Sequence, residues 1–140
     1  MEKITLSGEN FTLRLSFEVT REDIALPVNT SLLVSLIGED FSAETALDVD
    51  IKALSAFSYE LCRLYETLSG HAEISEPYGA KSHLAFEGDG MGHIKVSGRL
   101  HSQNTIGNAF SLEFENHLDQ TELRGFCVSL RKVCSAALNL

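Results

Sequence analysis

Residues 11–19 alternate strictly between apolar and polar side chains. The apolar positions are Phe11, Leu13, Leu15, Phe17 and Val19. Successive side chains of a strand point to opposite faces, so this pattern predicts a strand with one buried and one solvated face. Further apolar segments at residues 4–6, 31–37 and 41–49 predict three more strands in the same half of the chain.

From residue 50 the apolar period lengthens to that of a helix. The repeating apolar positions are Leu54, Phe57, Leu61, Leu64 and Leu68. Asp50 precedes them as a suitable N-cap, and Gly70 follows them as a suitable helix stop. The pattern predicts one helix over residues 50–69, with an apolar stripe packed on the sheet and a polar side in water.

The second half of the chain predicts the same order of four strands and one helix. Strands are expected at residues 71–75, 81–87, 93–100 and 110–114. The segment EGDGMG predicts a turn, in which Gly88, Gly90 and Gly92 accommodate positive φ. The segment LDQTEL predicts a helix start with a capping box, in which Asp119 bonds the first-turn amides and Glu122 reaches back.

A shift of 69 residues aligns the two halves without a gap. The matched pairs include Leu15 with Leu84, Phe17 with Phe86, Ile37 with Ile106, Gly38 with Gly107, Phe41 with Phe110, Asp50 with Asp119, Leu54 with Leu123, Phe57 with Phe126 and Leu61 with Leu130. Repeated structure imposes such repeated choices, although any two amphipathic units share some periodicity by coincidence. We therefore predict an α+β fold, in which an antiparallel sheet of about eight strands carries two helices on one face. It forms a single domain, residues 1–140, of two pseudo-two-fold halves, residues 1–69 and 70–140.

Composition and charge narrow the classes of function. The 140 residues carry 20 acidic and 11 basic side chains, a net charge of −9. Such a surface repels phosphate backbones, so we expect no nucleic-acid binding. No apolar run approaches the roughly 20 residues of a membrane span, and the first residues lack a leader pattern. These features predict a cytoplasmic protein without membrane attachment, whose three cysteines are small buried hydrophobes.

The sequence contains none of the common catalytic or phosphate-binding motifs. The segment GDGMG lies between two predicted strands, which indicates a hairpin instead of a phosphate loop. His83, His93 and His101 are expected to point outward together with Lys95 and Arg99, two cations that would repel a metal ion. We therefore expect no metal, no other cofactor and no enzymatic activity.

Two pairs of carboxylates project from the duplicated strands, Glu44 with Asp48 and Glu113 with Glu115. The second pair shares one side of its strand only if the strand has no bulge. A hydrolase would need such acids in a cleft with one raised pKa, whereas these are expected to be exposed. The sheet face without helices is therefore either simply solvated or a recognition surface, used across the sheet or along an edge strand.

Four segments of the chain combine these caps, turns and inward positions: FSAET, LSAFSYELCRLYETLSGHAEI, GHIKVSGRL and FSLEFENHLDQTELRGF. Together they resemble a family of small bacterial proteins, the WapI-type immunity proteins, and related uncharacterised sequences. The likeness spans about residues 30–130 and is strongest at LYETLSG, GHIKVSG and LDQTEL. It implies a protein that binds and neutralises a contact-delivered toxin made by the same cell, and it implies no catalytic residues.

Two hypotheses of function follow. In the first, a cytosolic immunity module binds a basic toxin domain through exposed acidic residues. The residues proposed for this contact are Glu39, Asp40, Glu44, Asp48, Glu113 and Glu115. In the second, a small-molecule-binding or enzymatic domain holds a pocket between the helices and the sheet, lined by convergent polar groups.

Overall fold

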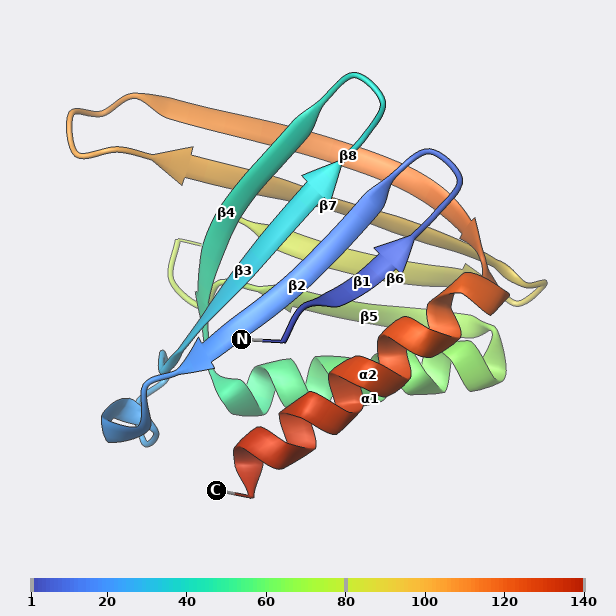
Figure 1. Ribbon diagram of the computed structural model, residues 1–140, viewed down its shortest axis with the longest axis horizontal. Coiled ribbons are helices and arrows are strands. Elements are labelled where there is room, and N and C mark those ends of the chain that lie inside the picture. The colour runs from blue at the N-terminus through green and yellow to red at the C-terminus, as the bar shows by residue number, and fades with distance from the viewer. Residues whose placement is uncertain (1, 80, 140) are drawn as a thin grey trace.

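The computed structural model describes residues 2–79 and 81–139, which form eight strands and two α-helices (Figure 1). Sheet A contains β1 (Ile4–Ser7), β2 (Thr12–Val19), β3 (Thr30–Ile37) and β4 (Ser42–Val49). Helix α1 (Ile51–Thr67) follows. Sheet B contains β5 (Ser69–Ser75), β6 (His83–Asp89), β7 (His93–Gln103) and β8 (Ala109–Asp119), and helix α2 (Gln120–Leu138) comes after it.

The expected α+β class, the eight antiparallel strands and the two helices are confirmed, but the strands divide between two sheets instead of forming one. In each sheet the strand order follows the sequence. Because α1 separates β4 from β5 along the chain, no hairpin joins the sheets. The apolar faces of both sheets and both helices are instead buried together in one continuous core.

Each half of the chain packs its helix against the sheet of the other half, an arrangement that we call the exchange of helices. Sheet A crosses sheet B, and the helices lie side by side along one flank of the pair (Figure 1). Helix α1 packs along β5 and β6 of sheet B, whereas α2 packs against β1 of sheet A. Where β4 crosses β7, the Thr45 hydroxyl donates to the carbonyl oxygen of His101 at 3.3 Å. Each helix therefore covers apolar surface from the other half.

Three phenylalanines join the helices to sheet B. The Phe86 ring lies 6.0 Å from the rings of both Phe57 on α1 and Phe126 on α2. Phe57 and Phe126 are almost completely buried, which confirms their expected placement in the core. Such spacings suit tilted and offset aromatic pairs. The stack therefore fixes both helices on one strand.

The internal duplication is consistent with the burial of its matched pairs. Phe41 immediately precedes β4 and is 72% exposed, and Phe110 lies near the start of β8 and is 77% exposed. Both belong to the inward-pointing set of their strands but lie beyond the core. The helix pairs are fully buried in both copies: Leu54 with Leu123 and Leu61 with Leu130. Equivalent positions thus meet equivalent environments.

The middle strands do not keep the gap-free alignment. In sheet A, Val34 lies between Leu15 and Thr45, and in sheet B the residues 69 positions later flank Gly98. Val34 and Gly98 are only 64 positions apart. The stretch from Leu84 to Gly98 is five residues shorter than the stretch from Leu15 to Val34. The stretch from Gly98 to Phe114, through the β7–β8 hairpin, is five residues longer than the stretch from Val34 to Thr45. That hairpin consequently reaches further from the core than the β3–β4 hairpin (Figure 1).

The start of α1 is organised by Asn29, a buried side chain in the β2–β3 connection. Its Oδ1 accepts from the Ile51 N–H and the Thr30 hydroxyl, both at 2.8 Å. Its Nδ2 donates to Asp50 Oδ1 at 3.1 Å and to the carbonyls of Ile24 and Leu26 at 3.2 and 3.1 Å. The helix begins after Asp50, as expected, because this carboxylate accepts from the Lys52 N–H at 2.9 Å.

The start of α2 differs from its prediction. The helix follows Asp119, but the Asp119 side chain makes no cap bond, so the expected capping box with Glu122 is wrong. Asp119 remains the last residue of β8 and pairs with His93, which holds it in the sheet. The Gln120 N–H instead donates to the Gly92 carbonyl at 3.0 Å.

Two glycine predictions also need correction. Helix α1 ends before Leu68, which adopts the left-handed conformation with φ 64°, and Gly70 follows within β5 with φ 112°. Gly90 and Gly92 have the expected positive φ, whereas Gly88 does not. A Cβ at Gly88 would lie 2.5 Å from the Leu68 carbonyl oxygen, so this glycine permits close approach of the α1–β5 junction.

Among the described residues, neither helix combines the length and hydropathy needed to cross a membrane.

Candidate functional site

The outer face of sheet B gathers every histidine of the sequence. Strand alternation puts His93, Lys95, Arg99 and His101 of β7 on this face, as expected. The registers of the neighbouring strands add side chains from β5, β6 and β8 to the same face. The complete histidine set is His71, His83, His93, His101 and His117.

Charges alternate across this face from strand to strand. Lys95 Nζ on β7 lies 3.9 Å from both Glu87 Oε2 on β6 and Glu115 Oε1 on β8. His71 Nδ1 lies 3.8 Å from Glu87 Oε1, and His117 Nε2 lies 3.6 Å from Glu115 Oε2. These half-exposed pairs each contribute little to stability. Together they form a chain of pairs that runs from β5 through β6 and β7 to β8.

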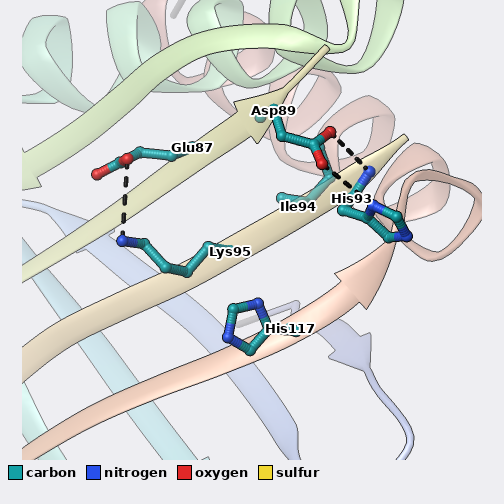
Figure 2. A pocket seen from close by; sticks show the side chains of 7 residues that line it. Glu87, Asp89, His93, Ile94, Lys95 and His117 are labelled. Carbon is teal, nitrogen blue, oxygen red and sulfur yellow. Dashed lines mark hydrogen bonds and ion pairs between the residues drawn. The ribbon is translucent and has the colours of Figure 1, made fainter. Parts of the chain in front are cut away.

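The β6–β7 turn holds a well-ordered carboxylate (Figure 2). Asp89 Oδ1 accepts from the backbone N–H groups of Met91 at 2.7 Å and His93 at 3.2 Å, and Oδ2 lies 3.1 Å from His93 Nδ1. The Met91 N–H is the main cause that lowers the pKa of Asp89, and His93 lowers it further. The carboxylate therefore stays ionised at neutral pH.

Two open hollows lie on this face. The first, of about 270 Å³, is lined by Glu87, Gly88, Asp89, His93, Ile94, Lys95 and His117 (Figure 2). The second, of about 560 Å³, is lined by His83, Ser97, Gly98, Arg99, Glu113, Phe114 and Glu115. Ligand pockets are typically enclosed and mostly apolar. Hollows walled by charged side chains on an open sheet suit contact with another surface better.

The histidines do not assemble a metal centre in the part of the chain that is described. Across residues 2–79 and 81–139, no three side chains of His, Cys, Asp or Glu converge closely enough to hold a metal ion. The His101 ring is hydrogen-bonded to Ser111, whose hydroxyl oxygen lies 2.6 Å from His101 Nδ1. The same hydroxyl oxygen accepts from Arg99 Nη2 at 3.4 Å.

All three cysteines are free. Cys127 and Cys134 are buried as expected, whereas Cys62 is only partly buried and packs against the core. Burial, with a further contribution from the neighbouring Cys62, raises the pKa of the Cys127 thiol from 9.0 to about 12. Burial likewise raises the pKa of Cys134 to about 11. Because the thiolate is the nucleophile, two protonated, buried thiols are unsuited to catalysis at neutral pH.

The six acidic residues expected to bind a partner fall on separate surfaces. Glu39 and Asp40 are exposed in the β3–β4 turn. Glu44 and Asp48 are exposed on the outer face of sheet A. Glu113 and Glu115 are exposed on the outer face of sheet B, and the unbroken β7–β8 register confirms that no bulge separates their orientation.

Two features of this surface were missed by the sequence reasoning. His71 and His117 were not assigned to the histidine face, although alternation along HAEIS and FENHLD was a usable signal. The role of β8 (Ala109–Asp119) as an edge strand had no signal in the sequence pattern, because strand order depends on tertiary structure.

A comparison of the sequence with protein-family models and with curated proteins gives no match.

Proposed function

We propose that this chain is a cytosolic protein-binding module, and that it acts as an immunity protein neutralising a basic, contact-delivered toxin domain. The observation that carries the proposal is the separation of apolar side chains in the core from charged side chains on the surface. Most large apolar side chains are buried in one shared core, while the outer sheet faces and the β3–β4 turn carry exposed carboxylates. With a net charge of −9, such surfaces favour rapid encounter with a basic protein.

The alternative, a domain with a small-molecule pocket between helices and sheet, receives less support. The space between α1, α2 and β6 holds the stacked rings of Phe57, Phe86 and Phe126. The two hollows on sheet B are open and charged. Both features favour recognition of a surface over enclosure of a ligand.

The proposal is tested with the toxin domain encoded beside this chain. We expect the purified chain to capture that domain, to abolish its toxicity on co-expression, and to bind it less tightly as salt rises, since screening weakens attraction between exposed charges. A matched acidic protein of unrelated fold serves as the control for non-specific attraction. Failure to capture or neutralise any adjacent toxin domain would overturn the proposal.

A further inference from the structure

The four edge strands of the two sheets differ in how their free edges are covered. Helix α2 packs against β1, and α1 packs along β5. At β4, the Asp48 N–H donates to Glu76 Oε2 at 3.3 Å, and β7 packs against the strand, so this edge is partly occupied. Within residues 2–79 and 81–139, the backbone of β8 bonds no segment beyond β7 along its free edge.

The free edge of β8 is long and regular. All 11 residues of Ala109–Asp119 pair with β7 in an unbroken register. At both ends the ladder continues through even-numbered residues, because Asn104 N–H donates to the Asn108 carbonyl and Gln120 N–H to that of Gly92. Alternate residues of an antiparallel strand bond opposite neighbours. The odd-numbered residues therefore direct their N–H and C=O groups to the free edge: Ser111, Glu113, Glu115 and His117.

The side chains beside this edge specify what kind of strand fits. On the outer face, Arg99 of β7 lies opposite Glu113 of β8, and Lys95 lies opposite His117 and 3.9 Å from the diagonal Glu115. The acidic side chains of β8 at Glu113 and Glu115 therefore stand beside the free edge. Glu113 makes no ion pair with the described residues. On the inner face Phe110 is exposed, and Leu112 and Phe114 are half-buried. The next strand would match both faces by alternating basic and apolar side chains.

A second copy of this chain is a poorer occupant. Antiparallel pairing of β8 with itself places glutamates of one copy opposite or diagonal to glutamates of the other, and like charges across strands are destabilising. Charged side chains are a common protection of edge strands against self-pairing.

From the open edge and its two faces we infer that β8 is the docking edge, which a partner extends with a strand of alternating basic and apolar residues. This inference rests on the proposed function and names the element that performs it. Main-chain hydrogen bonds supply affinity in such strand addition, and the alternating side chains supply specificity. The duplicated strand β4 is less open, because Glu76 bonds the Asp48 N–H on its free edge and β7 packs against the strand.

The test uses a seven-residue peptide that alternates lysine and valine, with amide exchange measured by NMR. In the free protein the amides of Ser111, Glu113, Glu115 and His117 should exchange rapidly, and those of the even-numbered residues of β8 slowly. The peptide should protect the four odd-numbered amides. A peptide with the same residues in two blocks is the control and should protect them far less.

Two matched double variants separate the β8 edge from general acidity. Glu113→Gln with Glu115→Gln should weaken peptide binding about tenfold, from the loss of two cross-strand charge pairs. Glu44→Gln with Asp48→Asn removes two charges from sheet A and should leave binding within about twofold, because no strand adds there.

A third variant blocks the edge without breaking the ladder. Glu113→Pro removes an N–H that faces away from β7, so the sheet should persist while strand addition is lost. Its comparison is Glu113→Gln, and circular dichroism verifies the fold of both.

The outcomes distinguish this inference from the proposed function. Capture of the toxin domain without protection of the odd-numbered β8 amides would overturn the docking edge and leave the immunity role intact. Peptide protection without toxin capture would support the docking edge and contradict the immunity role. A stable dimer of the free chain, with those amides already protected, would also overturn the inference, since a second copy would then occupy the edge.

Discussion

Replacement of Asn29 by alanine is expected to destabilise the protein more than its position in a connecting loop suggests. Asn29 is only 3% exposed, and its amide bonds the first turn of α1 and the loop before β3. Truncation leaves the N–H of fully buried Ile51 without an acceptor. Leaving a buried donor unpaired costs about 1–3 kcal/mol.

The magnitude follows from the bonds that water cannot replace. The carbonyls of Ile24 and Leu26 belong to partly exposed loop residues, so water can take the place of Nδ2 there. The unpaired Ile51 N–H and the lost bonds to Thr30 and Asp50 remain, each bond contributing about 0.5–1.5 kcal/mol. Together they give a loss of about 3 kcal/mol, or a fall in Tm of roughly 10 °C for a domain of this size.

Urea unfolding followed by far-ultraviolet circular dichroism measures this loss, since the sequence has no tryptophan to report by fluorescence. The slope of free energy against urea should not change. Asn104→Ala is the matched control: its Oδ1 also accepts two hydrogen bonds, here from the N–H groups of Ile106 and Asn108 at 3.1 and 3.0 Å, but in an exposed loop. Equal losses for the two variants, or less than about 1 kcal/mol for Asn29→Ala, would refute the reasoning.

Three further predictions concern the helices and the thiols. Asp50→Ala should cost about 1 kcal/mol in urea unfolding, and Asp119→Ala much less, because only Asp50 makes a cap bond; equal costs would contradict this. Phe126→Ala should cost about 3–5 kcal/mol by calorimetry, and a near-neutral effect would remove Phe126 from the core. Cys127 and Cys134 should resist a thiol reagent at pH 8 until urea unfolds the chain. Because their folded pKa values are raised, their contribution to stability is complete below pH 9 and falls as pH rises toward 12.

Local patterns predicted the elements of this fold well. The alternation in residues 11–19 and the helical spacing from Leu54 depend on burial along one element, so both could be read from sequence. The division into two sheets could not, because it depends on which strands meet after α1. Nor could the exchange of helices, since the stripe on α1 would suit either sheet.

The candidate site was predicted only in parts, for a similar reason. The outward direction of Glu113, Glu115 and the β7 histidines followed from alternation alone. The capping box at Asp119 failed because β8 keeps that residue in its ladder. The free edge of β8 depends on where the other described segments lie in space, and local sequence patterns do not determine that.

The exchange of helices has a mechanical consequence. Because α1 lies on the second sheet and α2 on the first, neither copy can open without exposing the interior of the other. The molecule should consequently resist pulling as one unit, with no half that yields first. A load applied at β8 would be shared by both halves of the chain.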